Sequence, residues 1–261
     1  MQLMTCMGRK SGGDGMALYQ TEAVVIDARN WGEADKIMTF FTKERGLVEA
    51  AAFGCRRSRS PLAANMQLFS YIELQLAEGR QLDTVKQCHL RHHYKRLCED
   101  FHVMSYGAVV AEVVREFMPA GVPEPSLFTA LLEILQGFEK RDPRVTALAA
   151  ILQIIEHTGL QLHYEHCLNC GKKVGDGATL MLKKGGVLCQ ECKEEGGIEF
   201  SEELQGTILA LRDFDWRSSK PLNLHGSLIM QAEKITLSHL QNLLGHSLKS
   251  MEFIRNCSEI N

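Results

Sequence analysis

Four cysteines in the second half of the chain have the spacing of a metal site. They form two pairs, each with two residues between its members, and 18 residues separate the pairs: Cys167, Cys170, Cys189 and Cys192. A two-residue gap lets both thiolates of a pair point at one ion, and two pairs supply the four ligands that tetrahedral Zn²⁺ takes at about 2.3 Å. The pattern predicts one structural zinc ion, because four thiolates leave no coordination position open for catalysis.

Other uses of a C-x-x-C pair are a disulfide, a redox centre and an iron–sulfur cluster. The chain has 9 cysteines, and the five outside the cluster are scattered, which is typical of a reducing compartment rather than of a disulfide framework. No βαβ pattern surrounds either pair, which argues against a redox role. His163 and His166 are near enough to be ligands, but the four-cysteine set is already complete, so we interpret both as surface residues.

Basic side chains gather in the first hundred residues, although the whole chain has a formal charge of −3. Residues 1–100 carry 14 Lys+Arg against 12 Asp+Glu, which leaves 15 against 20 for residues 101–261. Two acid-free clusters lie in this front part: Arg56, Arg57 and Arg59, and then Lys86, Arg91, Lys95 and Arg96 with His89, His92 and His93. Such clusters are most often solvated faces, but they are also typical of surfaces that bind phosphate. We interpret the three histidines as part of a charged, solvated turn rather than as metal ligands.

The elements that carry the first basic cluster read as short strands. We expect strands at residues 18–28, 35–42, 46–54, 68–78 and 81–88. Alternation is clearest in the fourth, where Ile72, Leu74 and Leu76 would face a core while Tyr71 and its alternate neighbours face outward. Five short strands with turn signals between them and no long helical run predict an antiparallel barrel, and about 70 residues fit an OB-fold.

After residue 88 the hydrophobic period changes from 2 to 3.6, which predicts helices. Asp142 before Pro143 predicts the start of one helix and Ser201 the start of another. A last helix is expected to carry Leu237, Leu240, Leu244 and Leu248. Between these helices, residues 179–182 and 187–188 flank a Lys-Lys-Gly-Gly turn, which predicts a hairpin that belongs to a zinc ribbon.

These elements place the chain in the α+β class. We expect a disordered tail at residues 1–16, with Met16 as an alternative start, and an OB-fold nucleic-acid-binding domain at residues 17–88. An all-α domain is expected at residues 89–165 and 197–261, with the four-cysteine zinc ribbon inserted at residues 166–196.

Composition and motifs exclude several functional classes. With 45% hydrophobic and 23% charged residues among 261, the chain has an ordinary globular composition. No apolar stretch reaches the roughly 20 residues that span a bilayer, and the first fifteen residues lack the order of a secretory signal. We therefore expect a cytoplasmic protein with no membrane partner. Phosphate-loop, zinc-protease and esterase motifs are absent, so we expect no enzyme.

Several short motifs, taken in order, resemble the amino-terminal domain of the RecO recombination mediators. The motifs are Glu22–Ile26, Gly32–Ile37, Phe40–Thr42, Gly46 and Phe53–Gly54, followed by Arg56, Arg57, Leu68 and Phe69. The helices that follow, interrupted by a cysteine cluster, resemble the carboxy-terminal part of the same family. The likeness covers about residues 17–255.

The resemblance implies a protein that binds DNA without catalysing a reaction and that is associated with the bacterial nucleoid. RecO-like proteins bind single- and double-stranded DNA and anneal complementary strands coated with single-strand-binding protein (SSB). They act with RecR to load RecA in gap and double-strand-break repair. Members of the family differ in whether they keep the zinc cysteines. The implied partners are DNA, RecR and the C-terminal tail of SSB, and indirectly RecA.

The basic residues suggest how such a barrel would hold DNA. A groove on an OB barrel would neutralise phosphates and release counterions, and we expect this role of Arg29, Lys36, Arg45, Arg56, Arg57 and Arg59. Tyr71 faces outward and either stacks on bases or packs within the sheet. The second cluster, with Lys86, Arg91, Lys95 and Arg96, is the candidate for a second DNA surface or for the acidic tail of SSB.

Two other functions stay open on the sequence alone. The first is a zinc-ribbon module that binds RNA or associates with transcription, and it would use the ribbon lysines Lys172, Lys173, Lys183 and Lys184. The second is a thiol-dependent enzyme that uses one C-x-x-C pair. Inert cysteines and about one zinc ion per chain would exclude the enzyme.

Overall fold

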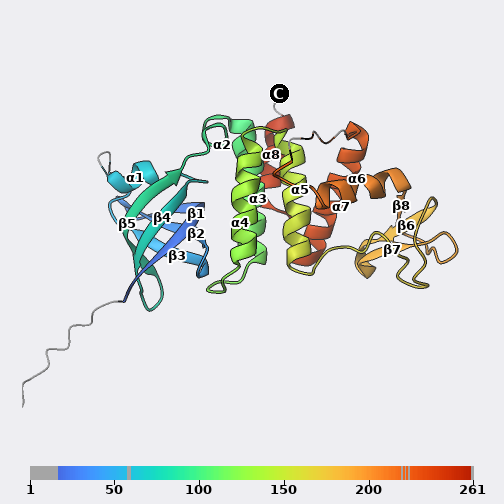
Figure 1. Cartoon of the computed structure of the whole chain (residues 1–261), viewed down its shortest axis with the longest axis horizontal. Coiled ribbons are helices and arrows are strands. Elements are labelled where there is room, and N and C mark those ends of the chain that lie inside the picture. Colours follow the sequence, from blue (N-terminus) through green and yellow to red (C-terminus); the bar gives the residue numbers. More distant parts are fainter. Residues whose placement is uncertain (1–16, 58–59, 219, 221, 223, 260–261) are drawn as a thin grey trace, which may run out of the picture.

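The computed structural model describes residues 17–57, 60–218, 220, 222 and 224–259, and its N-terminal part is a closed barrel (Figure 1). The strands are β1 (Leu18–Trp31), β2 (Asp35–Thr42), β3 (Gly46–Ala52), β4 (Tyr71–Ala77) and β5 (Asp83–His92). Their order is β1-β2-β3-β5-β4, and β1 closes the barrel on β4. Neighbouring strands are antiparallel except β3 and β5, where Ala50 pairs with Asp83 in parallel. The expected five-stranded OB barrel is confirmed.

Alternating side chains of β4 fill the barrel, as the sequence pattern predicted. Ile72, Leu74 and Leu76 are each 0% exposed, and they share one hydrophobic cluster with Met38 and Phe40 of β2. Because these three side chains face the closed interior, Glu73 and Gln75 between them point outward. The tail predicted at residues 1–16 lies outside the described residues.

Several strand limits and one helix differ from the sequence prediction. Strand β1 runs to Trp31 rather than to residue 28, and β3 ends at Ala52 rather than at residue 54. A short helix, α1 (Pro61–Asn65), precedes β4, and β4 begins at Tyr71 rather than at residue 68 because Phe69 has a positive φ of 67°. Strand β5 runs to His92 rather than to residue 88. His89 and His92 are therefore exposed residues of a strand, and placing them in a turn was wrong.

The helices after the barrel follow the predicted pattern closely. They are α2 (Lys95–Glu99), α3 (Phe101–Phe117), α4 (Pro125–Phe138), α5 (Pro143–His157), α6 (Glu202–Arg212), α7 (Gly226–Leu244) and α8 (Lys249–Glu259). The predicted caps are confirmed: Asp142 Oδ1 accepts from Val145 N at 3.0 Å and Ser201 Oγ accepts from Leu204 N at 3.2 Å. Each cap satisfies an N–H that has no partner within its helix.

The last predicted helix is in fact two helices. Gly245 has a φ of +77° and ends α7, so Leu248 lies in the connection before α8 and not in the same helix as Leu244. A left-handed residue is the usual end of an α-helix, and glycine adopts it without a steric penalty. The leucine spacing continued across this break, which is why periodicity alone did not show it.

A small sheet is inserted between α5 and α6. It contains β6 (Ala178–Met181), β7 (Gly186–Leu188) and β8 (Ile198–Phe200) in the order β7-β6-β8, with a 3₁₀ turn, η1 (Leu182–Lys184), between the first two strands. The predicted hairpin is thus confirmed, and β8 is an additional strand that the sequence did not indicate. The residue limits of the domains stay predictions.

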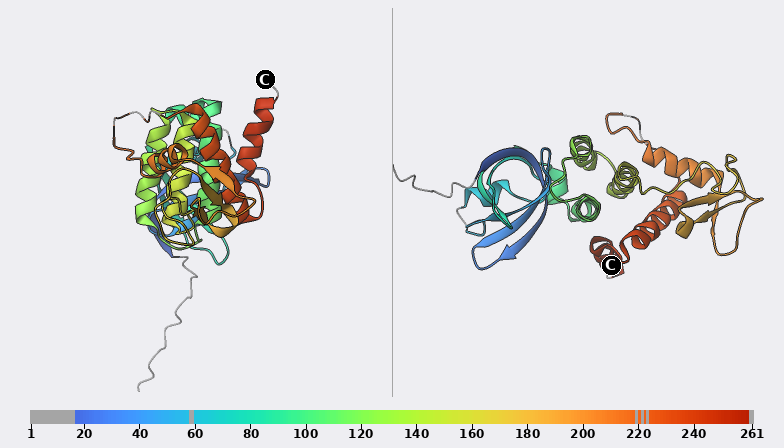
Figure 2. Two further views of the ribbon diagram at one scale, coloured as in Figure 1. Left: turned by 90° about the vertical axis from the view of Figure 1, so that its right-hand side faces the viewer. Right: turned by 90° about the horizontal axis from the view of Figure 1, so that it is seen from below.

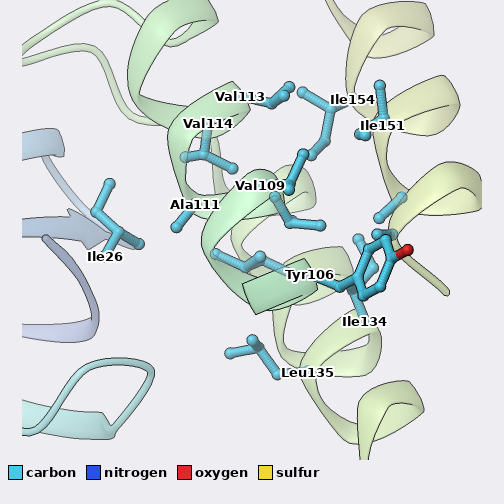
Figure 3. Packing of buried hydrophobic residues seen from close by; sticks show 14 of the residues in the cluster. Ile26, Tyr106, Val109, Ala111, Val113, Val114, Ile134, Leu135, Ile151 and Ile154 are labelled. Carbon is cyan, nitrogen blue, oxygen red and sulfur yellow. The ribbon is translucent and has the colours of Figure 1, made fainter. Parts of the chain in front are cut away.

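The barrel and the helices share one hydrophobic core. Val24, Ile26, Phe41 and Phe69 of the barrel belong to the same cluster as the buried faces of α3, α4 and α5. Figure 3 shows Ile26 of β1 facing Ala111 and Val114 of α3. At the rim, Arg115 of α3 forms an ion pair with Asp27 of β1 at 2.6 Å. The barrel therefore has a fixed position on the helices.

The three parts lie in a row, with the barrel at one end, the helices in the middle and the small sheet at the other end (Figures 1 and 2). Helix α5 connects the two cores, because Ile151 and Ile154 pack toward the barrel side while Leu148 and Leu152 pack in the cluster that includes the small sheet. Within the described residues, no helix has both the length and the apolar character needed to cross a membrane.

Candidate metal centre and nucleic-acid interface

The small sheet brings the four predicted metal ligands together. The Sγ atoms of Cys167, Cys170, Cys189 and Cys192 all lie within 4.8 Å of one another. The sulfurs of Cys170 and Cys189 are 3.7 Å apart, whereas a disulfide would hold them at about 2.05 Å. Four ligands placed tetrahedrally at about 2.3 Å from an ion are about 3.8 Å apart. The cluster therefore fits a four-coordinate metal ion and not disulfide bonds.

Each pair of cysteines sits on a tight backbone turn. Gly171 N donates to Cys167 O at 2.9 Å in the first turn, and Cys192 N donates to Cys189 O at 3.0 Å in the second. Gly171 has a φ of +73°, which a residue with a side chain adopts only with strain. These turns bend the chain so that both sulfurs of a pair face the same point.

The thiols of the cluster favour ionisation in the presence of a cation. Burial raises the pKa of Cys167, but backbone N–H groups of Cys189, Cys170 and Asn169 outweigh it and lower the pKa to about 6. The Asn169 side chain lowers the pKa of Cys192, but the neighbouring cysteine side chains and burial together raise it to about 12. The backbone N–H groups therefore favour the thiolate form of Cys167, and all four cysteines can ionise when a cation balances their charge.

The other polar residues of this region lie outside the cluster. His163 and His166 are exposed, as expected of surface histidines. Lys172 pairs with Glu191 at 2.8 Å and Lys184 with Glu194 at 2.6 Å, so two of the four ribbon lysines are neutralised. These pairs reduce the positive charge that a nucleic acid would meet on the small sheet.

At one end of the barrel, Arg56 and Arg57 follow β3, and Arg56 lies against the turn between β1 and β2. Arg56 N donates to Ala34 O at 2.9 Å, and the Arg56 guanidinium donates to Gly32 O at 2.8 Å. Arg57 N donates to Gly54 O at 3.1 Å. Both side chains are exposed. The two arginines are therefore held on a fixed backbone while their charge faces solvent.

Two more of the predicted DNA-binding residues lie on the strands beside this turn. Arg29 of β1 pairs with Glu49 of β3 at 3.3 Å, and both side chains are at least half exposed. Lys36 is half-buried at the start of β2, where it lies in register with Asn30 of β1 and Ala52 of β3. Arg59 lies outside the described residues.

Arg45 occupies the opposite end of the barrel. It lies in the turn between β2 and β3, where its guanidinium is 3.8 Å from the centre of the Tyr19 ring and 3.2 Å from a Glu78 oxygen. The seven residue steps of β2 separate this turn from the Arg56 end, a distance of roughly 23 Å. The structure does not bring Arg45 and Arg56 onto one surface patch.

The second basic cluster is divided among different roles. Lys86 is exposed on β5, Arg91 pairs with Glu73 of β4, and Lys95 pairs with Glu99 of the same helix at 3.9 Å. The guanidinium of Arg96 donates to Phe138 O at 2.9 Å and to Arg141 O at 2.7 Å. Because these are carbonyls at and beyond the end of α4, Arg96 serves as a cap for that helix.

Tyr71 is half-buried between the barrel and the helices. Its ring centroid is 6.2 Å from that of Phe128 in α4 in an edge-on arrangement, and its hydroxyl donates to Glu22 at 2.8 Å. Tyr71 is half-buried and packs against α4, and not only within the sheet as the second alternative had it. The reason is that α4 covers this face of the barrel.

The structure instead exposes two aromatic residues that the sequence reasoning missed. Trp31 at the end of β1 is 44% exposed and Phe53 after β3 is 53% exposed, and their ring centroids are 5.8 Å apart. Both flank glycines, Gly32 and Gly54, that form turns. A large apolar residue directly beside a turn glycine was the available signal, because turns are normally polar and solvated.

Two models of known protein families match the chain. The family model described as "Recombination protein O N terminal" matches residues 16–94, and that described as "Recombination protein O C terminal" matches residues 98–252. The chain belongs to the RecO family. The two RecO models meet at α2 (Lys95–Glu99), the short helix between the barrel and the helical part.

Curated relatives support the same assignment over nearly the whole chain. A DNA repair protein RecO of Symbiobacterium thermophilum is 33% identical, and the match covers 92% of this chain and 97% of the relative. The DNA repair protein RecO of Alkaliphilus metalliredigens is 31% identical over 89% of this chain and 98% of the relative. That of Caldicellulosiruptor bescii is 26% identical over 92% and 99%. The resemblance inferred from short motifs is thus confirmed.

Proposed function

We propose that this chain is a non-catalytic DNA-repair protein that binds single- and double-stranded DNA and anneals complementary strands. Membership of the RecO family supports a DNA repair role, since its curated relatives are named DNA repair proteins. The observation that carries the DNA contact is the pair of exposed arginines, Arg56 and Arg57, fixed at the end of an OB barrel. No bond is made or broken in this function.

The proposed contact works through phosphates. Arg56 and Arg57, in the segment after β3, neutralise backbone charge and release counterions, and such contacts carry no base information. Annealing needs this indifference to sequence, because any two complementary strands must be accepted. Arg29 and Lys36 on the neighbouring strands extend the positive surface. The exposed ion pair of Arg29 with Glu49 opposes phosphate binding only weakly, because such pairs contribute about 0–1 kcal/mol.

Annealing also needs a second surface, and we assign it to Lys86, Arg91 and Lys95. Lys86 is exposed, and Arg91 and Lys95 are in exposed ion pairs that a phosphate or a peptide carboxylate can replace. Arg96 is excluded from this surface in our proposal, because its guanidinium is committed to two backbone carbonyls. The acidic tail of SSB is the proposed protein ligand of this surface, RecR the proposed partner, and RecA loading the proposed outcome.

The metal centre has a structural role in this proposal. Four thiolates would hold one Zn²⁺ with no open position for water or substrate. The ion would fix the two cysteine turns and the small sheet, and DNA contact would remain at the barrel. The alternative of a ribbon that binds RNA is disfavoured by the acidic partners of Lys172 and Lys184.

Salt-dependent binding tests the DNA contact. We expect R56Q/R57Q to weaken binding of a labelled dT20 and to reduce the slope of log affinity against log salt by about 1.4, which is two contacts at about 0.7 each. The matched control K173Q/K183Q removes two exposed ribbon lysines and should leave the slope unchanged. If the ribbon variant loses affinity and the barrel variant does not, the nucleic-acid site is on the ribbon.

An annealing assay tests the activity itself. Complementary oligonucleotides coated with SSB are mixed with the chain, with and without RecR, and duplex formation is followed by fluorescence. The wild-type chain should accelerate annealing without a nucleotide cofactor, and R56Q/R57Q should reduce the rate. Unchanged annealing in the presence of the wild-type chain would overturn the proposed function.

A further inference from the structure

Trp31 and Phe53 form an exposed aromatic pair at the same barrel end as Arg56 and Arg57. Trp31 is the last residue of β1 and Phe53 follows the end of β3, and their ring centroids are 5.8 Å apart. They are 44% and 53% exposed. The other tryptophan, Trp216, is half-buried and donates to Gln153 at 2.7 Å. Exposed aromatics are unfavourable in water, and this pair lies beside the exposed arginines Arg56 and Arg57, which makes it a candidate binding surface.

Hydrogen bonds between the two turns hold the pair in place. The Asp35 carboxylate accepts from Gly54 N at 2.7 Å, and Arg56 N donates to Ala34 O at 2.9 Å. These bonds join the chain just after Phe53 to the turn just after Trp31. The rings are thus carried by a preformed backbone, which lowers the entropy lost when a ligand binds.

The charges around the pair indicate the kind of ligand. Arg56 and Arg57 are exposed beside the rings, and Arg56 reaches the carbonyl of Gly32, the residue next to Trp31. Glu33, at the tip of the turn, is exposed and repels a phosphate there. A polyanion would therefore pass on the arginine side, with its apolar groups over the rings. A chain of stacked aromatic bases on a phosphate backbone has this chemistry, and every base offers a flat face.

We propose that Trp31 and Phe53 are a base-stacking platform for single-stranded DNA, beside the phosphate contacts of Arg56 and Arg57. This inference rests on the proposed DNA-binding function and adds the part of the ligand that the rings recognise. Bases in a duplex are stacked on one another and do not reach the platform. The rings therefore bind single strands in preference to duplex, whereas the arginines bind both.

Abasic DNA separates base stacking from phosphate binding. The probes are labelled dT20 and an oligonucleotide of the same length that has sugars and phosphates but no bases. The wild-type chain should bind dT20 more tightly than the abasic probe. The variant W31A/F53A should lose affinity for dT20 by a factor between about 5 and 150 for each ring, down to its affinity for the abasic probe, which should not change.

Three further variants make the result specific. R56Q/R57Q should weaken binding of both probes, because it removes phosphate contacts. F101A/F253A removes another exposed aromatic pair, on α3 and α8, whose ring centroids are 5.7 Å apart, and should change neither affinity. W31F should keep most of the affinity for dT20. In the wild-type chain, dT20 should quench tryptophan emission and the abasic probe should not.

Several outcomes would overturn the platform. One is that W31A/F53A weakens binding of both probes equally, and another is that it weakens neither. A third is that both DNA affinities stay unchanged while RecR-dependent annealing is lost, which would assign the rings to a protein partner. Failure of the wild-type chain to bind either probe would instead overturn the proposed function, so the two failures are distinguishable.

Discussion

Glu112 is a buried carboxylate that holds the start of α8. It lies in α3, is 8% exposed, and accepts hydrogen bonds from Lys249 N at 3.0 Å and from Ser250 N at 2.9 Å. These N–H groups have no partner inside α8, and a negative charge is favourable at a helix N-terminus. Burial raises the pKa of Glu112, but the hydrogen bonds from Ser250 and Lys249 outweigh it and hold the pKa below 4.5.

The variant E112Q should destabilise the docking of α8. An amide presents one oxygen instead of two to these donors, so we expect a loss of about 1.5–3 kcal/mol at pH 7. A folded pKa below the unfolded value gives stability that is present above pH 4.5 and is lost as the pH falls through the folded pKa. The difference between wild type and E112Q should therefore shrink in acid.

Urea unfolding at several pH values and hydrogen exchange of α8 measure this effect. The control is E116Q, because Glu116 lies on the same helix in an exposed ion pair with Arg115, and its change should stay below about 0.5 kcal/mol. Equal unfolding curves for E112Q and wild type would show that the carboxylate does not hold α8.

Arg96 has a structural role, whereas the exposed Arg56 is proposed to bind phosphate. R96Q should lower the free energy of unfolding by about 1–3 kcal/mol, because it leaves the carbonyls of Phe138 and Arg141 without their donor. Its affinity for dT20, measured by anisotropy well below the melting temperature, should remain within about twofold of wild type. A normally folded R96Q with a large loss of DNA affinity would contradict this role and return Arg96 to the DNA surface.

The sequence predicted the cysteine cluster correctly, but it could not show which arginines bind DNA and which hold the fold together, because these roles depend on tertiary packing. The spacing of Cys167 and Cys170 already determines that both sulfurs reach one ion, because the turn that joins them is local. The partners of Arg96 lie 42 and 45 residues away, so its role depends on how α2 packs on α4. Trp31 and Phe53 are likewise brought together by tertiary contact, and no local pattern pairs them.

At the scale of elements, the junction of β3 with the α3–α4 connection fixes the barrel on the helices. Gly121 N donates to Leu47 O at 3.1 Å, and Ala120 forms bridges with Gly46 and Leu47. A β-carbon on Gly46 would lie 2.0 Å from Val122 O, and the φ of Gly46 is +61°. The close backbone approach therefore requires glycine at this position.

The variant G46A should cost more stability than G32A. Gly32 has a similar φ of +67° but nothing within 4 Å of an added β-carbon, so G32A carries the left-handed backbone penalty of about 1–2 kcal/mol alone. G46A adds overpacking against a backbone carbonyl, which we expect to cost a further 1–3 kcal/mol or so. Chemical denaturation measures the free energy of unfolding of the two variants. Equal losses would show that the backbone around Val122 moves to accommodate the added β-carbon with little cost.

The elements that the sequence missed are short and depend on neighbours. Long helices such as α3 and α5 bury one face or more, so the spacing of their apolar residues shows the helical repeat in the sequence. In contrast, β8 has three residues and exists because it pairs with β6. The break at Gly245 was hidden because the leucines on both sides keep helical spacing.

At the scale of the molecule, the four-cysteine cluster and the proposed DNA surface lie at opposite ends (Figure 1). The small sheet shares a hydrophobic cluster with α5, α6 and α7, to which it contributes Leu180 and Leu188. The barrel shares a different cluster with α3, α4 and the other side of α5. Removing the metal should therefore weaken the core nearest the cysteines and leave the barrel intact.

We expect metal removal to separate stability from DNA binding. Ejecting the ion with a chelator under reducing conditions should release about one Zn²⁺ per chain and lower the melting temperature, because binding energy at a structural zinc site is folding energy, on the order of 10 kcal/mol in small fingers. The affinity for dT20 below the lowered melting temperature should stay within about threefold of the untreated chain. C167S should behave like the chelated chain, whereas C257S, in α8, should keep the ion. If DNA affinity falls with metal content while the barrel remains folded, the nucleic-acid surface includes the small sheet. The proposal that the barrel alone binds DNA and the metal only stabilises the fold would then be wrong.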